Sequence, residues 1–301
     1  MQELCADAEA VCRCLFCGQA SLQRKERWPF MKEILHTFAV CAYKDSPYLE
    51  ACIRSLKEQS DPSEIICCTS TPSPYIERIV EKYQVPLYVR EGKSNIREDW
   101  MFAYRKAHGR LVTIAHQDDV YRKDYAKELK KAYARYPDLL VFVSDYLTLK
   151  MKAGEENAEN AKVEAFNLVW LVKKLLRLPL RFTFLADQTW VKKSCVLFGN
   201  SLCCPACTYH KALIGDDMFH SAYDFALDWD NLYELAGKKG RFICVEKPLL
   251  AYRVHEGATT KACIEDHRRA ADEMAMFRKM WPEPVVKLLM HFYKKAYEAY
   301  E

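Results

Sequence analysis

The segment 111–119 is an aliphatic run that stops abruptly at two adjacent carboxylates, Asp118 and Asp119. A strand that is buried on both faces of a parallel sheet is apolar along its length, and open α/β sheets bind ligands where such strands end. Two acids in this position therefore indicate a site for a metal held on phosphate, or for a sugar. The alternative is that both acids open the next helix, where Asp is a favoured N-terminal residue.

Strand and helix patterns alternate along the first half of the chain. Short apolar runs predict strands at 36–42, 65–68, 85–89, 111–115 and 139–143. Apolar residues at helical spacing lie between these runs, as at Ile76, Ile79 and Val80. The alternation predicts an α/β fold with a Rossmann-like central sheet of parallel strands and with helices on both faces.

The second half of the chain is less regular. Residues 166–181 mix apolar side chains with Lys and Arg in the pattern of a basic amphipathic helix, which either packs on the core or contacts a membrane surface. Residues 154–162 are polar and acidic and predict an exposed loop. We expect residues 1–30 to form an N-terminal extension with little order, and residues 265–301 to form C-terminal helices.

Composition narrows the class of protein. The 301 residues are half hydrophobic, which is enough for a large globular domain, and the formal charge of +4 comes from well-mixed acids and bases. This balance argues against nucleic acid as the main partner. No run approaches the roughly 20 apolar residues of a membrane span, and no apolar block marks a signal peptide. We therefore expect a cytoplasmic protein.

The 14 cysteines are expected to be reduced thiols, because several lie inside apolar runs where Cys behaves as a small hydrophobe. Two groups could instead bind zinc, although neither has the paired spacing of a zinc ribbon. These groups are Cys5, Cys12, Cys14 and Cys17, and Cys195, Cys203, Cys204 and Cys207. Packing, or a place in a substrate loop, is the expected role of the second group.

Four segments carry a resemblance to a known family. They are the predicted strand and helix at 38–60, the acidic motif at 116–119, the acidic segment at 225–236 and the closing segment at 248–260. In this order they resemble family 2 of the glycosyltransferases, the nucleotide-sugar-dependent enzymes of the GT-A fold. The resemblance implies a GT-A domain over 31–264, with a nucleotide-binding half at 31–145 and an acceptor half at 165–264.

The resemblance implies a binding site for a nucleoside diphosphate sugar, with a UDP-sugar favoured over a GDP-sugar. Tyr43 is expected to stack on the nucleobase, since any base can stack on an aromatic face. Thr69 and Ser70 stand where the family commonly has a base-binding aspartate, and their hydroxyls can donate and accept hydrogen bonds. The remaining donor contacts are assigned to Ala42, Asp45, Asp99, Trp100, Gln117, Asp118, Asp119 and Arg253.

The motif at 116–119 falls where the family carries its Asp-x-Asp metal motif, with His116 in place of the first acid. The resemblance therefore makes Asp118 the ligand of a divalent cation, Mg²⁺ or Mn²⁺, which bridges the two phosphates of the donor. His255 is the second expected metal ligand, because a neutral imidazole can bind such an ion.

The segment 225–236 supplies the predicted chemistry of transfer. The resemblance assigns Asp228 as the base that takes the acceptor hydroxyl proton during an inverting transfer. Trp229 and Asp230 are expected to contact the acceptor, a glycan or a lipid-linked sugar, in surface polysaccharide biosynthesis. The basic amphipathic segments favour peripheral contact with the inner face of the membrane.

Alternatives remain open for single residues and for the whole chain. Tyr43 could cover the sheet end, Asp228 could stabilise a helix N-terminus, Arg253 could form a salt bridge and His255 a loop hydrogen bond. Because the first metal acid and the base-binding aspartate are missing, the chain could be a non-catalytic nucleotide-sugar binding or scaffold protein. A nucleotidyl or phosphoryl transferase is disfavoured, since the segment 42–46 contains no glycine for a phosphate loop.

Overall fold

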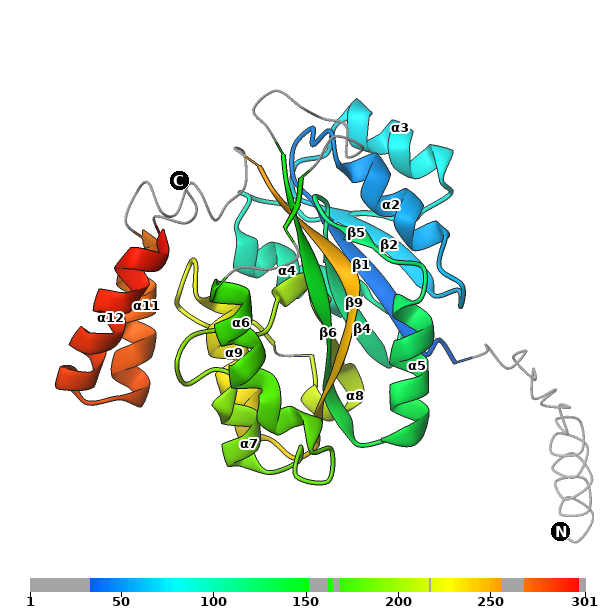
Figure 1. Cartoon of the computed structure of the whole chain (residues 1–301). Helices are drawn as coiled ribbons and strands as arrows, with labels where there is room; N and C mark the ends of the chain where they lie inside the picture. Colours follow the sequence, from blue (N-terminus) through cyan, green and yellow to red (C-terminus); the bar gives the residue numbers. More distant parts are fainter. Residues whose placement is uncertain (1–32, 152–161, 165–167, 217, 256–267, 298–301) are drawn as a thin grey trace, which may run out of the picture. The chain divides into compact units, whose positions relative to one another are not determined.

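The computed structural model describes residues 33–151, 162–164, 168–216, 218–255 and 268–297. Residues Ile34–Glu301 form one compact unit, which does not include Met1–Glu33. A mixed β-sheet lies at the centre of this unit, and helices cover both of its faces (Figure 1). The predicted α/β class is therefore confirmed.

Nine strands of the described residues form this sheet. In spatial order they are β3 (Leu87–Val89), β2 (Glu64–Thr69), β1 (His36–Ala42), β4 (Leu111–His116), β8 (Cys207–His210), β6 (Leu139–Lys150), β9 (Arg241–Val254) and β5 (Val120–Tyr121), while β7 (Lys162–Glu164) pairs with β6. Strands β1 to β4 pair in parallel, as predicted. The helices between them are α2 (Leu49–Lys57), α3 (Pro74–Lys82) and α4 (Ile96–Lys106).

The parallel strands form where the sequence is continuously apolar, because both of their faces are buried. Val40, Ile66 and Ile114 have almost no exposed surface. Helix α3 begins after Ser73, whose hydroxyl accepts a hydrogen bond from the N–H of Ile76, and similar local signals start α4. Because β1, β2 and β4 run in the same direction, their carboxyl ends meet at one edge of the sheet.

Strand β8, which the sequence pattern does not predict, runs antiparallel between β4 and β6, so the sheet is mixed although the predicted strands all run in one direction. Its four residues offer neither an alternating pattern nor a long apolar run from which a strand could be recognised. Buried hydroxyls anchor it, because Thr208 Oγ1 lies 2.6 Å from Thr113 Oγ1 and 2.9 Å from the Tyr125 hydroxyl. With these polar groups paired, the strand can occupy the middle of the sheet.

Strands β6 and β9 are the longest and lie side by side in parallel. The strand predicted at 139–143 continues to Lys150, and its pairing with β9 is irregular between Ser144 and Tyr146. Such bulges bend a strand and increase its twist. Beyond the bulge, the end of β9 reaches the loop after β4, where the N–H of Arg253 donates to the carboxylate of Asp119.

The remaining helices are short, apart from a C-terminal pair. They are α5 (Tyr125–Arg135), α6 (Leu168–Arg177), the 3-10 helix η2 (Leu178–Arg181), α7 (Thr189–Ser194), the 3-10 helix η3 (Cys204–Ala206), α8 (Lys211–Ile214), α9 (Leu227–Gly237), α11 (Arg268–Met280) and α12 (Glu283–Tyr297). Most of the loop predicted at 154–162 lies outside the described residues. The predicted C-terminal helices are present, and the Phe277 ring of α11 lies 5.1 Å from the Trp229 ring of α9.

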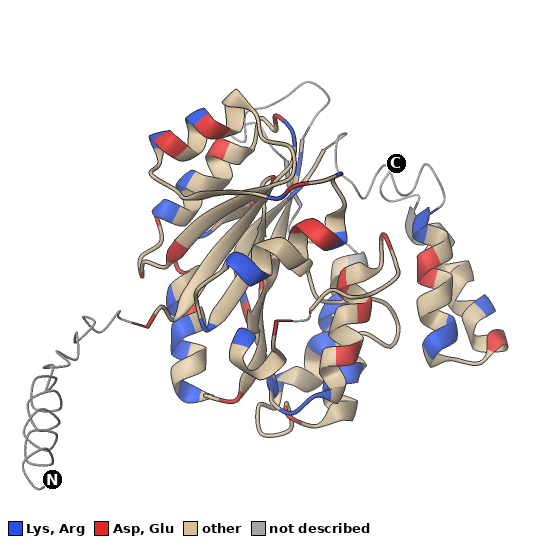
Figure 2. Cartoon of the chain, turned by 180° about the vertical axis from the view of Figure 1, so that it is seen from behind, with Lys and Arg blue, Asp and Glu red and all other residues tan. Residues whose placement is uncertain are grey.

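Charged residues lie mainly on helices and loops, whereas the central strands carry few of them (Figure 2). The described cysteines are free and mostly buried, while the group from Cys5 to Cys17 lies outside the described residues. In the part of the chain that the structure describes, no three Cys, His, Asp or Glu side chains gather as a complete metal cage. None of the described helices is both long enough and apolar enough to cross a membrane.

Gly109 precedes β4 at a point where β1 leaves no room for a side chain. A Cβ atom on Gly109 would lie 2.7 Å from the backbone N of Thr37. Gly109→Ala should therefore lower the free energy of unfolding by about 1–3 kcal/mol, the usual cost of overpacking. Urea denaturation measures this change. Gly237→Ala is the control, because a Cβ there meets no atom within 4 Å, and equal destabilisation of both variants would contradict the explanation.

Candidate active site

The site is built at the edge of the sheet where the parallel strands end. The strand register pairs Ala42 with Thr69, each the last residue of its strand, and His116 is the last residue of β4. The Ala42 side chain is buried. The loops that follow these strands carry most of the residues that the sequence predicts for the donor.

Reciprocal hydrogen bonds join the loops after β1 and β4. The backbone N–H of Tyr43 donates to Gln117 Oε1 at 2.9 Å, and Gln117 Nε2 donates to the Tyr43 carbonyl at 3.0 Å. The oxygen and the nitrogen of the Gln117 amide are therefore both hydrogen-bonded to the backbone of Tyr43. The Tyr43 side chain makes none of these bonds, and the residue is 47% exposed. The geometry makes the Tyr43 ring accessible for stacking and gives Gln117 a role in shaping the two loops.

The hydroxyl groups of the loop after β2 accept hydrogen bonds from the same loop and from the loop after β1. Thr69 is buried, and its hydroxyl accepts a hydrogen bond from the N–H of Thr71 at 3.0 Å. The Thr71 hydroxyl accepts one from the N–H of Lys44 at 2.7 Å. Asp45 is exposed and accepts a hydrogen bond from Ser73. Asp45 and Thr69 therefore belong to the same edge of the site.

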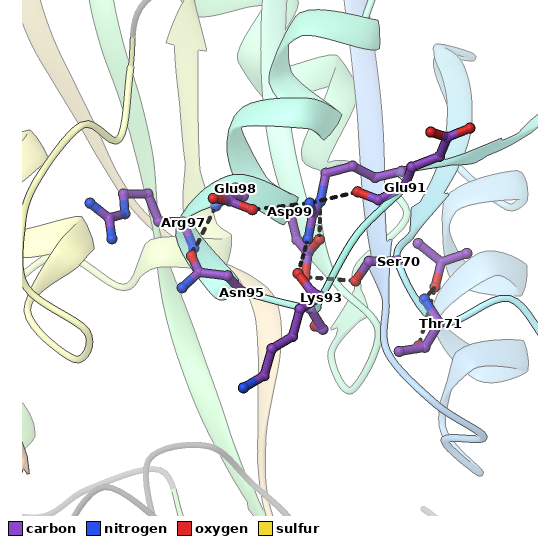
Figure 3. Close-up of polar contacts among 11 residues, drawn as sticks. Ser70, Thr71, Glu91, Lys93, Asn95, Arg97, Glu98 and Asp99 are labelled. Carbon is purple, nitrogen blue, oxygen red and sulfur yellow. Dashed lines mark hydrogen bonds and ion pairs between the residues drawn. The ribbon is translucent and has the colours of Figure 1, made fainter.

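Asp99 is the centre of a polar network beside this loop (Figure 3). Its carboxylate accepts hydrogen bonds from Ser70 at 3.0 Å and from Ser94 at 2.8 Å. Arg90 Nε donates to the same carboxylate at 2.7 Å, and Arg90 also pairs with the more exposed Glu98. Ser70 and Asp99, both predicted to face the nucleotide, thus contact each other.

Trp100 contacts the acidic motif through His116. The two rings are stacked, with centroids 4.9 Å apart and planes inclined by 28°. Burial lowers the pKa of His116 to about 4, so the imidazole is neutral at pH 7. Trp100 itself is almost fully buried. The pair shapes the start of the motif, and a direct contact of Trp100 with the donor stays a prediction.

Asp118 receives polar partners from two other loops. The Ser46 hydroxyl donates to Oδ1 at 3.0 Å, and His255 Nε2 lies 3.4 Å from Oδ2. Burial raises the pKa of Asp118, but the proximity of His255 and Ser46 lowers it by more, so the pKa lies below its ordinary value. Asp118 is therefore ionised at neutral pH.

The residues around Asp118 fit a divalent cation with few protein ligands. His116 Nε2 and Asp119 Oδ2 are buried and make no hydrogen bond in the described structure, whereas His255 Nε2 has only its long contact with Asp118. Such orphaned polar atoms usually have a ligand or a water molecule as partner. Asp118 and His255 can supply one carboxylate and one imidazole, and Mg²⁺ or Mn²⁺ commonly takes its remaining ligands from phosphates and water.

Arg253 is 2% exposed and ties β9 to the motif. Its N–H donates to Asp119 Oδ1 at 2.9 Å, and its Nε donates to the Asp118 carbonyl at 2.8 Å. The guanidinium lies 4.3 Å from the centroid of the Tyr48 ring, which also contacts the His255 ring. Burial raises the pKa of Asp119. Arg253 and Asp119 therefore hold the loop in place, and their contacts with a donor stay predictions.

Asp228 lies in the first turn of α9. Its carboxylate accepts hydrogen bonds from the N–H of Trp229 and from Asn200 Nδ2, each at 2.8 Å. Burial raises the pKa of Asp228 to about 6, although these donors and the charge of Lys173 oppose the shift. A carboxylate with this pKa is mostly ionised at pH 7 and can still accept a proton, which suits a general base.

Cys203 connects Asp228 with the acids at the strand end. Burial, followed by the charges of Asp119 and Asp228, raises the pKa of the Cys203 thiol. The charges of Asp119 and Asp228, which are about a hundred residues apart in the sequence, thus both act on this buried thiol.

Trp229 and Asp230 lie in contacts that support α9. Trp229 is buried, and its Nε1 donates to the Val196 carbonyl at 2.7 Å. Asp230 accepts a hydrogen bond from Lys279 of α11 at 2.8 Å. Both side chains thus help to fix the C-terminal helices, and their contact with an acceptor stays a prediction.

Several residues of the site are missing from the sequence-based set. Ser46 has the sequence pattern of a helix cap, because Pro47 follows it. In the structure its hydroxyl instead donates a hydrogen bond to the Asp118 carboxylate. Tyr48, Arg90 and Asn200 carry no motif of their own. Their partners lie far away in the sequence, except for Arg90, which precedes Asp99 by nine residues. Only that short separation could have indicated the contact.

Comparisons with known proteins agree with this geometry. The family model described as Glycosyl transferase family 2 matches residues 37–194, about half of the chain. No curated protein sequence gives a significant match.

Solved structures share the fold at low sequence identity. TarS of S. aureus (residues 1–349) is 13% identical, with a TM-score of 0.54 over 85% of this chain and 69% of that one. Glucosyl-3-phosphoglycerate synthase of Mycobacterium tuberculosis is 13% identical, with a TM-score of 0.51 over 83% and 81%. The mannosyltransferase PcManGT of Pyrobaculum calidifontis is 16% identical, with a TM-score of 0.51 over 87% and 69%. At these identities the likeness shows the fold alone.

The Asp99 network should contribute measurably to stability. Asp99→Ala leaves Arg90, Ser70 and Ser94 without their shared acceptor, so we expect the free energy of unfolding to fall by about 1–3 kcal/mol. Urea denaturation tests this expectation. Glu98→Ala is the matched control, since Glu98 pairs with the same arginine but is 60% exposed, and it should cost less than about 0.5 kcal/mol. A larger loss in the control would contradict the assignment.

Proposed function

This chain belongs to glycosyltransferase family 2 and is a glycosyltransferase, and we propose that it is a metal-dependent, inverting enzyme that transfers a sugar from a nucleoside diphosphate sugar to a glycan or lipid-linked acceptor. The observation that carries the proposal is a pair of carboxylates held in place by hydrogen bonds, Asp118 by Ser46 next to His255, and Asp228 by Asn200 and the N–H of Trp229. Their pKa shifts agree with these roles. The pKa of Asp118 is lowered, which suits a cation ligand, and that of Asp228 is raised to about 6, which suits a base.

The donor is proposed to be a UDP-sugar. The exposed Tyr43 ring can stack on a nucleobase. The Ser70 hydroxyl, in the loop after β2, is oriented by its hydrogen bond to Asp99. Among the similar structures, TarS binds UDP-GlcNAc and the M. tuberculosis enzyme binds UDP, whereas PcManGT binds GDP-Man. The other proposed donor residues are Ala42, Asp45, Thr69, Trp100, Gln117, Asp118, Asp119 and Arg253.

Asp118 and His255 are the proposed ligands of Mg²⁺ or Mn²⁺. When bound, such an ion neutralises the charge that develops on the leaving diphosphate. Ser46 holds one oxygen of the Asp118 carboxylate, while the other oxygen faces His255. Two of the similar structures, the M. tuberculosis enzyme and PcManGT, contain Mn²⁺, which supports this part of the proposal.

Asp228 is the proposed base. The oxygen of the acceptor hydroxyl attacks the anomeric carbon while the bond from that carbon to the diphosphate oxygen breaks, and the configuration inverts. Asp228 accepts the hydroxyl proton, and the nucleoside diphosphate leaves with the electron pair of the broken bond. The hydrogen bonds from Asn200 and from the N–H of Trp229 hold the Asp228 carboxylate in one orientation. Trp229 and Asp230 remain the proposed acceptor contacts.

The proposed setting is the cytoplasmic face of the membrane, in surface polysaccharide biosynthesis. A lipid-linked acceptor would lie in the bilayer, so the enzyme would meet it from the inner leaflet. Helix α6, with Lys174 beside the exposed Val172 and Leu175, supports peripheral contact of this kind.

Donor binding should depend on Asp118 and on a divalent cation. In calorimetric titrations we expect UDP or a UDP-sugar to bind the wild type about tenfold more tightly with Mn²⁺ than without it, and Asp118→Ala to lose this difference. Asp61→Ala is the control, because Asp61 pairs with Lys130 outside the site. If neither UDP nor GDP nor their sugars bind under any condition, the assignment fails and the likeness is one of fold alone.

Transfer should require Asp228 in its ionised form. Asp228→Asn should lower the rate by about 10²–10⁴-fold, the usual contribution of a general base, without changing donor affinity. Because protonation removes the base, wild-type activity should fall as the pH drops through about 6. Steady-state kinetics against pH measures both effects.

Glu234→Gln is the control for Asp228→Asn, since Glu234 lies on the same helix but pairs with Lys279, and it should keep the activity and the pH profile. Donor binding by the wild type without transfer to any acceptor of a broad panel would instead indicate a non-catalytic binding protein.

A further inference from the structure

Exposed apolar side chains are concentrated in one short segment. The described residues contain twelve large hydrophobic side chains that are strongly exposed, and half of them lie between 172 and 190. They are Val172, Leu175, Leu178, Phe182, Phe184 and Trp190, and we refer to them as the apolar face. Scattered exposed hydrophobics are ordinary, but a group of this kind marks an interaction surface.

The apolar face follows the outer side of α6 and η2. Val172, Leu175 and Leu178 are spaced by three residues, which places them on one side of a helical segment. The opposite side packs inward, because Arg177 and Leu180 are buried. The buried side of the segment packs on the rest of the chain, whereas its exposed apolar side has no such packing partner within the described structure.

Aromatic side chains extend the face beyond η2. The rings of Phe182 and Phe184 contact each other edge to face, with centroids 6.2 Å apart. Phe184 is 72% exposed and Trp190, on α7, is 63% exposed. Phe and Trp at the boundary between apolar and wet surroundings are typical of proteins that lie in a membrane interface.

The charges around the apolar face are strongly biased. Residues 168–193 contain six Lys or Arg and a single Asp. Arg177 and Lys192 are buried and Lys173 points toward Tyr146, so the positive charge at the surface beside the apolar face comes mainly from Lys174 and Arg181. Lys174 lies over the Trp170 ring, and Arg181 pairs with Glu246 while both stay partly exposed. A positive rim of this kind complements anionic lipid headgroups. It disfavours a second copy of the chain as the occupant, because a two-fold contact through this face would bring like charges together.

A small hollow lies beside the rim. It is lined by Asp145, Lys174, Arg177, Arg181, Cys244 and Glu246. Arg177 is 4% exposed and pairs with Asp145, but its Nε and Nη1 make no hydrogen bond in the described structure. Because these N–H groups are buried, Arg177 supports the hollow from inside through Asp145, and the exposed Arg181 and half-buried Lys174 are the cations at its surface.

The same helix also borders the proposed base. Lys173 Nζ lies 3.3 Å from the Tyr146 hydroxyl, and its charge lowers the pKa of Asp228. Helix α6 thus turns Lys173 toward the acceptor half while the neighbouring Val172 is exposed. A membrane-docking surface on α6 would therefore bring a lipid-linked acceptor toward Asp228, the proposed base.

We propose that α6, η2 and α7 dock on an anionic lipid bilayer, with the apolar face in the interface and Lys174 and Arg181 toward lipid phosphates. The inference rests on the proposed function, because docking on a membrane would serve an enzyme whose acceptor is lipid-linked. Its test is independent of transfer.

Vesicle co-sedimentation of the full chain tests the docking surface. The wild type should bind vesicles of phosphatidylcholine containing about one quarter phosphatidylglycerol more tightly than vesicles of phosphatidylcholine alone, and salt should weaken the binding. The triple variant Phe182→Ser, Phe184→Ser, Trp190→Ser should bind about tenfold or more weakly. The matched control is Leu213→Ser with Leu288→Ser, two exposed residues outside this segment, which should bind as the wild type does.

Three outcomes would overturn the inference. They are absence of wild-type binding to anionic vesicles, equal binding by the triple variant, and concentration-dependent self-association in sedimentation velocity that the triple variant abolishes. Because the substituted side chains are exposed, all variants should retain donor affinity in calorimetry. Lost vesicle binding with intact donor binding concerns the docking surface alone, whereas absent donor binding in the wild type concerns the proposed function alone.

Discussion

The site depends on one buried contact between strands that are distant in the sequence. Asp119, after β4, accepts a hydrogen bond from the N–H of Arg253 in β9, and Arg253 Nε donates to the Asp118 carbonyl. Burying Asp119 costs free energy, as its raised pKa indicates. In return, the contact fixes the loop after β4 and brings His255 to Asp118. The position of Asp118 thus depends on two contacts that each join a backbone group of one segment to a side chain of the other.

The parallel half of the fold could be predicted from the sequence, because its strands are continuous apolar runs and its helices begin at recognisable caps such as Ser73. The antiparallel part could not. Strand β8 has only four residues, and β6 continues past Val143 into polar residues because β9 pairs with it along its whole length. Such pairing is decided by the partner strand rather than by local sequence.

The candidate site likewise contains residues that could be predicted from the sequence and residues that could not. Asp118, Tyr43 and Ser70 could be predicted because strand ends are a local signal, and the structure does bring their loops together. The contact between Ser46 and Asp118 spans 72 residues and leaves no trace in either segment. Asp228 could be singled out by its acidic segment, whereas Asn200, which orients it, lies in an irregular segment before η3 that carries no motif.

The hydrogen bonds around Asp99 link Ser70, Ser94 and Arg90, and within the described structure they include neither Asp118 nor His255. The contact between these two parts of the proposed donor site runs instead through packing, because Trp100, which follows Asp99, stacks on His116. If Asp99 lies next to the nucleobase and Asp118 next to the diphosphate, as proposed, substitutions around Asp99 would alter the fit of the nucleobase without removing a hydrogen bond of Asp118. An enzyme built in this way can change its donor in evolution without rebuilding its reaction.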